Sequence, residues 1–113
     1  MKRFKFAFNG IINVFKNEQN FRIHAVSAVF VIIAGFIFSV NKTEWTILII
    51  AISMTASFEM INSALEYLSN FVSPGYDNKI KIIKDAAAGA VLISALGAFI
   101  LACIIFLPKI ISV

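Results

Sequence analysis

The residues best suited to chemistry in this sequence are carboxylates that interrupt an apolar segment. Asn62, Ser63 and Glu66 lie three, four and seven residues after Glu59, so a helix would place all four on one face. A carboxylate inside a bilayer costs a few kcal/mol unless it is paired, protonated or bound to a metal. This face is therefore either a functional site or a polar network that holds membrane helices together.

The depth of these carboxylates can be estimated from the helical rise. Counted from Trp45, Glu59 lies about 21 Å along the axis and Glu66 about 31 Å. Glu59 is then expected within the cytoplasmic leaflet of a bilayer and Glu66 at its surface. Such a site opens to lipid at one end and to the cytosol at the other.

Carboxylates at a cytosolic surface, with Lys84 nearby, suit Mg²⁺ and a polyphosphate. Magnesium commonly takes one or two protein carboxylates and shares phosphate oxygens, and a lysine neutralises phosphate charge. The deeper carboxylate is placed to accept a proton from a lipid alcohol. The sequence has no GxxxxGK loop, so a nucleotide would be held by another design.

The elements that must position these residues are membrane helices. The chain is 60% hydrophobic and 14% charged, more apolar than a soluble domain of this size can bury. We predict one all-α integral membrane domain over residues 1–113. Its membrane helices are expected at about 23–40, 45–72 and 85–107, with Pro108 ending the last one.

The segments between and before these helices are polar. We expect residues 41–44 to form a tight loop with a solvated Glu44, and Trp45 to anchor the interface. The Ser73-Pro74-Gly75 turn leads into a polar link over 76–84. Residues 1–18 have the pattern of a basic amphipathic helix on the membrane surface.

Loop charges predict the topology. The region up to Arg22 holds five of the ten Lys and Arg residues, and residues 73–84 hold three more. The positive-inside rule therefore places the N-terminus and the 73–84 link in the cytoplasm. Small residues between Ala86 and Ala98 predict close helix packing, within one chain or between chains.

Three runs of the sequence resemble a known family. They are NEQNFRIH at 17–24, FEMINSALE at 58–66 and KDAAAGAV at 84–91. In order and spacing they resemble the prokaryotic diacylglycerol kinases, which include the undecaprenol kinases. The resemblance implies a homotrimer of three-span subunits in the bacterial cell membrane, with active sites shared between neighbouring subunits. It also implies ATP- and Mg²⁺-dependent phosphorylation of a lipid alcohol.

The resemblance implies a role for each matching residue. Glu59 would be the general base, ordered by Asn62, and Glu18 and Glu66 would hold the Mg²⁺ that bridges the ATP phosphates. The nucleotide would be contacted by Lys84, Asp85, Tyr76, Asp77 and Gly10. The lipid side of the site would be ordered by Arg22, Ser63 and Asn70.

The sequence departs from the family at three positions. Asn70 stands where the family usually has aspartate, Asp77 where it often has histidine, and Phe6 where tyrosine is common. The neutral Asn70 would either lower activity or alter a helix-end contact. Asp77 adds negative charge near the expected nucleotide.

Other interpretations stay open at this point. An ion- or proton-conducting bundle also places carboxylates in a membrane, although this polar face covers only the cytoplasmic third of its helix. A structural accessory protein would use the acids for packing alone. A lone His24 is weak evidence for a metal site, and we expect it to make a polar contact instead. The NFRIH run resembles the undecaprenol kinases more than the enzymes acting on diacylglycerol.

Overall fold

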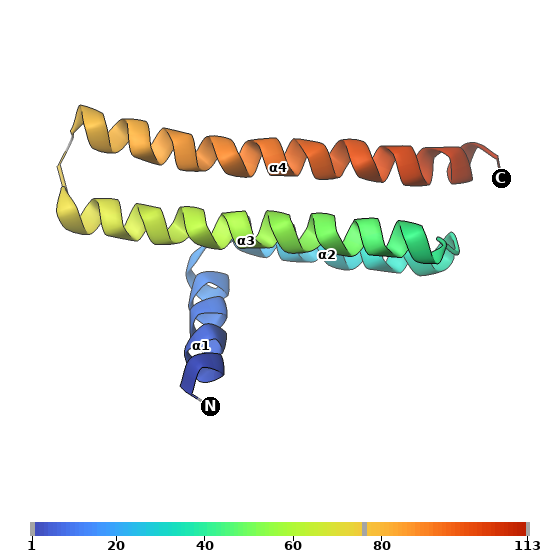
Figure 1. The fold of residues 1–113 in the computed structure, drawn as a ribbon, viewed down its shortest axis with the longest axis horizontal. Helices are drawn as coiled ribbons and strands as arrows, with labels where there is room; N and C mark the ends of the chain where they lie inside the picture. Colours follow the sequence, from blue (N-terminus) through green and yellow to red (C-terminus); the bar gives the residue numbers. More distant parts are fainter. Residues whose placement is uncertain (1, 76, 113) are drawn as a thin grey trace.

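The computed structural model of the chain describes residues 2–75 and 77–112, and the regular elements there are four helices. They are α1 (Lys2–Asn17), α2 (Gln19–Ile37), α3 (Lys42–Val72) and α4 (Asn78–Ile111). Figure 1 shows α2, α3 and α4 running along a common direction while α1 points away from them. The α3–α4 turn lies at one end of this bundle, and the α2–α3 turn and the C-terminal end of α4 lie at the other.

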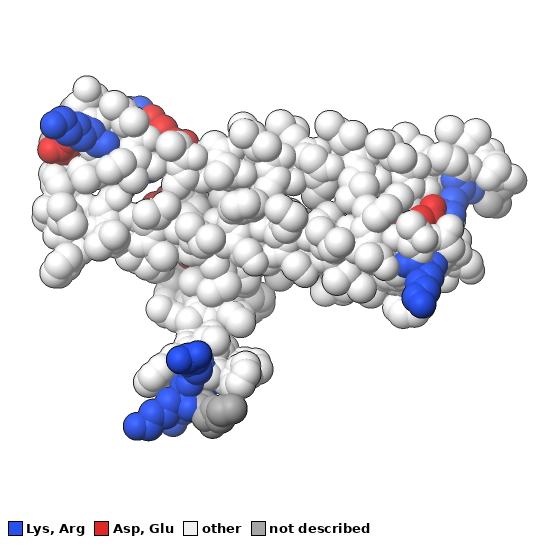
Figure 2. Space-filling model, in the orientation of Figure 1, with Lys and Arg blue, Asp and Glu red and all other residues white. Residues whose placement is uncertain are grey.

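Three of these helices, α2, α3 and α4, are long and apolar enough to cross a membrane. Their large apolar side chains point outward: Phe30 is 66% exposed, Phe36 73% and Phe99 68%. In Figure 2 the charged side chains lie at the two ends of the bundle and on α1, with an uncharged band between them. The predicted all-α membrane fold with three spans is confirmed, because only a hydrocarbon solvent suits that band.

The residues expected to form the 41–44 loop instead begin α3. Asn41 is the N-cap: its Oδ1 accepts from the Glu44 amide at 2.8 Å, and Glu44 Oε1 accepts from the Asn41 amide at 3.0 Å. This reciprocal capping box satisfies two amides that a helix end leaves free. The prediction that Glu44 is a solvated loop residue is wrong. Glu44 lies in the first turn of α3, and its Oε1 also lies 3.1 Å from Lys109 Nζ on α4.

Helix α4 is longer than predicted at both ends. Asp77 caps it by accepting from the amides of Lys79 at 2.8 Å and Ile80 at 3.4 Å, so most of the expected polar link is helical. Pro108 lies inside the helix and does not end it. A proline removes one hydrogen bond and crowds the carbonyl four residues earlier. Here that loss falls in the final turn, which the Lys109–Glu44 ion pair ties to α3.

Trp45, the predicted interfacial anchor, is half-buried and packs on α2. Its ring covers Gly35 of α2 so closely that an added Cβ there would come within 2.5 Å of the ring. The ring also packs on Phe36 with centroids 4.9 Å apart. Next to it, Val40, Leu48, Ile105 and Phe106 form the buried apolar cluster of the bundle.

The corner between α1 and α2 is fixed by Arg22. Its guanidinium donates to the carbonyls of Phe15 at 2.9 Å and Lys16 at 2.7 Å, which lie in the last turn of α1 and lack helical partners. The rings of Phe15 and Phe21 meet edge to face across the same corner, 6.5 Å apart. Together these contacts set the direction in which α1 leaves the bundle.

Candidate functional site

The polar face expected on the second membrane helix is present on α3. The helix is unbroken from Lys42 to Val72, so Glu59, Asn62, Ser63 and Glu66 share a side as their spacing requires. Glu59 is only 4% exposed and Ser63 only 3%. Burial of this degree in a chain whose apolar residues are mostly exposed marks the face as part of the protein interior.

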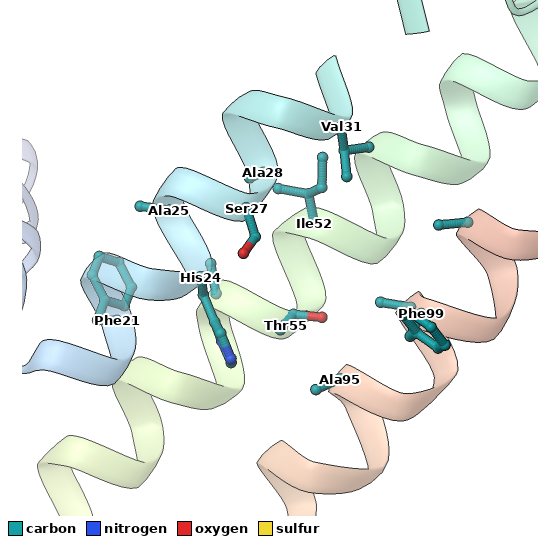
Figure 3. Close-up of a pocket in the computed structure, with 13 residues that line it drawn as sticks. Phe21, His24, Ala25, Ser27, Ala28, Val31, Ile52, Thr55, Ala95 and Phe99 are labelled. Carbon is teal, nitrogen blue, oxygen red and sulfur yellow. The ribbon is translucent and has the colours of Figure 1, made fainter. Parts of the chain in front are cut away.

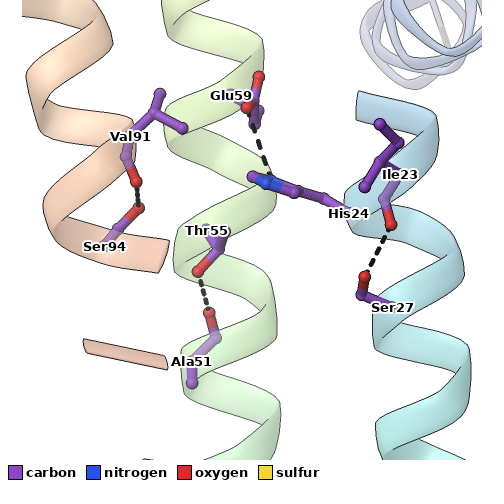
Figure 4. Close-up of polar contacts among 8 residues, drawn as sticks. All are labelled: Ile23, His24, Ser27, Ala51, Thr55, Glu59, Val91 and Ser94. Atoms are coloured by element: carbon purple, nitrogen blue, oxygen red, sulfur yellow. Dashed lines mark hydrogen bonds and ion pairs between the residues drawn. The ribbon is translucent and has the colours of Figure 1, made fainter. Parts of the chain in front are cut away.

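Glu59 is paired across the helix interface with His24 of α2. The Nδ1 atom of His24 lies 3.5 Å from Glu59 Oε1, and Figure 4 shows the imidazole reaching from α2 toward the carboxylate. Within the described residues, His24 Nδ1 and Asn62 Oδ1 are buried atoms without a hydrogen-bond partner. The polar contact expected for His24 is therefore present, and its partner is the candidate base.

Glu18 joins the same cluster from the α1–α2 corner. It occupies the N-cap position of α2, but its side chain makes no capping hydrogen bond and is free for other partners. Its charge and that of Glu66 both act on Glu59. Three carboxylates predicted to work together are thus close enough to influence one another within one chain.

Tyr67 is a member of this cluster that the sequence did not reveal. Its side chain lies against the Glu18 carboxylate and is also influenced by Glu66. Tyr67 is eight residues beyond Glu59 and four beyond Ser63, which places it at the edge of the same helical face of α3. The spacing could have indicated that place, but the contact with Glu18 depends on the position of the α1–α2 corner.

The cluster fits a magnesium ion shared with a nucleotide. Carboxylates and amide oxygens are the donors that Mg²⁺ prefers, and Glu18, Glu66 and the unpartnered Asn62 Oδ1 supply that chemistry. Among the described residues, no three His, Cys, Asp or Glu side chains form a group that would hold a metal by itself.

Helix α4 contributes Lys84, which is tied to α3. Its Nζ donates to Asn70 Oδ1 at 2.5 Å, the residue that stands where the family usually has aspartate. Asp85 turns elsewhere, pairing with Lys81 one turn earlier at 2.6 Å while both side chains remain well exposed. Lys84 and Asp85 thus stand beside the carboxylate cluster without an ion pair to it in the described part of the chain.

The remaining predicted site residues are not gathered here. Gly10 lies within α1 with open space where a Cβ would be, and Asp77 is engaged in capping α4. Tyr76 lies outside the described residues. Arg22 holds the α1–α2 corner and so positions Glu18 indirectly.

A cavity of about 490 Å³ lies between α2, α3 and α4, with His24 in its wall. Figure 3 shows the wall contributed by Phe21, Ala28, Ile52, Ala95 and Phe99 among others. The two hydroxyls in it, Ser27 and Thr55, donate to their own helices at Ile23 and Ala51, both at 2.9 Å. With those donors engaged, the cavity offers an apolar surface that suits hydrocarbon.

Comparison with known proteins decides the family. The sequence pattern of the prokaryotic diacylglycerol kinases matches residues 5–106. The chain belongs to the prokaryotic diacylglycerol kinase family. It is 37% identical over 108 residues to an undecaprenol kinase of Bacillus subtilis, covering 96% of this chain and 88% of that protein. It is 34% identical over 110 residues to a diacylglycerol kinase of Synechocystis sp., covering 96% of this chain and 63% of that protein.

Membership of this family makes the protein a membrane lipid kinase that uses ATP. The alternatives of a conducting bundle and of a structural accessory protein are not favoured. The carboxylate cluster, the apolar cavity and the basic end of α4 can accordingly be considered as parts of one kinase.

Proposed function

We propose that this kinase phosphorylates a polyprenol such as undecaprenol at the cytoplasmic surface of a bacterial cell membrane, with Mg²⁺ as its metal. The observation that carries the proposal is the position of Glu59. Its carboxylate is 4% exposed and contacts a histidine in the wall of an apolar cavity. A base in that position meets an alcohol that arrives from the hydrocarbon side.

Each residue of the cluster then has a distinct task. Glu59 accepts the proton as the lipid oxygen attacks the γ-phosphorus of ATP, and ADP leaves as the bond from the γ-phosphorus to the bridging oxygen breaks. Glu18 and Glu66, with Asn62, would hold Mg²⁺, which would supply positive charge for the phosphate oxygens. Lys84, on α4, would add a positive charge for the phosphates. Ser63 lies buried on the face of α3 that carries the two glutamates.

The separation of Glu59 and Glu66 matches the two phases that the reactants come from. Seven residues of helix put about 10 Å between them along α3. The lipid hydroxyl comes from the hydrocarbon and the nucleotide from the cytosol, so the two carboxylates serve different reactants. This supports placing the N-terminus and the α3–α4 turn in the cytoplasm, as the loop charges predict.

The comparison with relatives favours a polyprenol over diacylglycerol. The undecaprenol kinase is 37% identical to this chain, which covers 88% of it, whereas the diacylglycerol kinase is 34% identical and covered over 63% of its length. The cavity of about 490 Å³ offers an apolar surface to hydrocarbon from either lipid.

We also propose a homotrimer, as the family resemblance implies. Gly89 and Gly97 of α4 have open space around the position of a Cβ, so their small size serves no packing within the chain. Small residues let membrane helices approach closely. A neighbouring subunit is the natural occupant of that space.

The test is transfer of radiolabelled phosphate from ATP to a panel of lipid alcohols by the purified protein. We expect undecaprenol to be phosphorylated faster than diacylglycerol, and transfer to stop when Mg²⁺ is chelated. Absence of transfer to every lipid from an intact assembly would overturn the proposal.

Glu59→Gln provides the internal check in the same assay. Removing a general base is expected to lower kcat by about 10²- to 10⁴-fold. Glutamine keeps the size of the side chain, so the trimer should persist in native mass spectrometry. Loss of the trimer with Glu59→Gln would instead assign the carboxylate a packing role.

A further inference from the structure

His24 is the single histidine of the chain and it stands on α2, a different helix from its partner. Its Nδ1 lies 3.5 Å from Glu59 Oε1, the distance of an ion pair with a protonated imidazole, and it makes no hydrogen bond among the described residues. Its ring also lines the apolar cavity between α2, α3 and α4. Figures 3 and 4 show the same side chain from these two aspects.

The charged groups around Glu59 show why its contact with His24 matters for the direction of its carboxylate. The groups whose charges act on Glu59 are His24 on α2, Glu18 at the α1–α2 corner and Glu66 on α3. The two carboxylates repel it, and a protonated His24 is the opposite charge that lies against it among the described residues. The nearest lysine of α4 within the predicted site, Lys84, is engaged with Asn70.

A glutamate side chain has several staggered rotamers separated by small energies. At 4% exposure, water is too scarce around Glu59 to hold its carboxylate in one of them. Repulsion from Glu18 and Glu66 would turn it away from the cluster, whereas the contact with His24 fixes Oε1 on the α2 side.

We propose that His24 is a positioning residue for the phosphoryl transfer. By holding Oε1 of Glu59, it leaves Oε2 free to accept the proton of the lipid hydroxyl. The inference rests on the proposed role of Glu59 as general base. His24 exchanges no proton with the substrate in this account; it sets the direction of the base.

Kinetics of three variants test the role. His24→Leu removes the contact and should lower kcat by about 50-fold with the KM for ATP unchanged, because a misplacement of about 1 Å costs up to 10² in rate. Asparagine places an amide nitrogen near the position of Nδ1, so His24→Asn should keep kcat within about threefold of the native value. Glutamine places its amide near Nε2 instead, and His24→Gln should resemble His24→Leu.

The order of the Asn and Gln variants is what a purely structural role would not produce. If His24 only joined α2 to α3, both amides would substitute about equally, and any loss would follow the loss of trimer. Equal activity of His24→Asn and His24→Gln, or a native kcat for His24→Leu, would overturn the inference.

A spectroscopic measurement tests the contact without turnover. With one histidine in the sequence, the ¹⁵N and ¹³C ring signals of labelled protein in bicelles belong to His24 without assignment. Glu59→Gln should shift them. The matched control is Glu44→Gln, about 22 Å away along α3, where glutamine can still accept from the Asn41 amide; it should leave them in place.

The two measurements separate this inference from the proposed function. Ring signals that ignore Glu59→Gln would overturn the contact and the inference, whatever the kinase activity. Native protein that phosphorylates no lipid alcohol would overturn the proposed function and the positioning role with it, even with the ring signals responding.

Discussion

At the scale of single residues, the contact between Lys84 and Asn70 gives a physical meaning to a departure from the family. Lys84 Nζ donates to the amide oxygen of Asn70. A carboxylate at position 70 would hold the lysine in an ion pair and neutralise it. The amide positions the lysine while leaving its full charge for phosphate. The sequence left two possible effects of Asn70, a lower activity or an altered contact at the helix end. The contact with Lys84 predicts that Asn70 acts on the affinity for ATP.

We therefore expect Asn70→Asp to raise the KM for ATP about twofold to threefold, the size of a partly exposed ion pair. The KM for the lipid should not change, because Asn70 lies beyond Glu66 on α3, toward the α3–α4 turn and away from Glu59. Steady-state kinetics with ATP as the varied substrate measures this. Asn70→Gln is the matched neutral control, and an unchanged KM for ATP in Asn70→Asp would contradict the account.

The sequence was sufficient to predict which residues share a face of one helix. The shared face of Glu59 and Ser63 follows from spacing alone, and both are buried as that face requires. The partners of that face do not follow from spacing. His24 precedes Glu59 by 35 residues on another helix, and Tyr67 meets Glu18 only because α1 and α2 turn where they do.

At the scale of elements, helix ends were the least predictable feature. Because Asn41 and Asp77 cap them, α3 and α4 begin earlier in the sequence than predicted. Both residue types favour the N-cap position of a helix. Polar residues that pattern analysis assigns to loops continue a helix when a cap satisfies its first amides. Pro108 was likewise predicted to end a helix, but it lies in the last turn of α4, which the ion pair between Lys109 and Glu44 ties to α3.

The contact between Gly35 and Trp45 is an element-scale device that yields a stability prediction. Gly35→Ala would force a Cβ to within 2.5 Å of the indole, and such overpacking costs about 1–3 kcal/mol. We expect a lower midpoint of thermal unfolding in detergent, followed by circular dichroism. Gly10→Ala is the control within a helix, since nothing lies within 4 Å of its added Cβ. An equal effect of the two changes would show that Trp45 can move aside.

At the scale of the whole molecule, composition was sufficient to predict the solvent. A chain that is 60% hydrophobic exposes its phenylalanines and isoleucines along three helices. On the face drawn in Figure 2 the charged side chains lie toward the ends of the bundle and on α1, whereas Glu59 is buried inside it. What composition does not give is the relative length of the three helices, which depends on the caps and on the α1–α2 corner.

That inequality of length has a consequence for the membrane around the protein. Helix α2 has 19 residues, against 31 in α3 and 34 in α4, so it covers about 28 Å while the others cover about 46 and 51 Å. Of the three membrane helices, α2 alone has no additional length with which to span a thicker bilayer. Helix α2 also carries His24 near its beginning, so the position of α2 in the bilayer sets the depth of the His24–Glu59 pair.

In vesicles of graded acyl-chain length, phosphoryl transfer should therefore peak where the hydrocarbon is close to 28 Å thick and fall in thicker membranes, where mismatch costs fractions of a kcal/mol per Å. The enzyme would then sense the thickness of the layer that supplies its substrate.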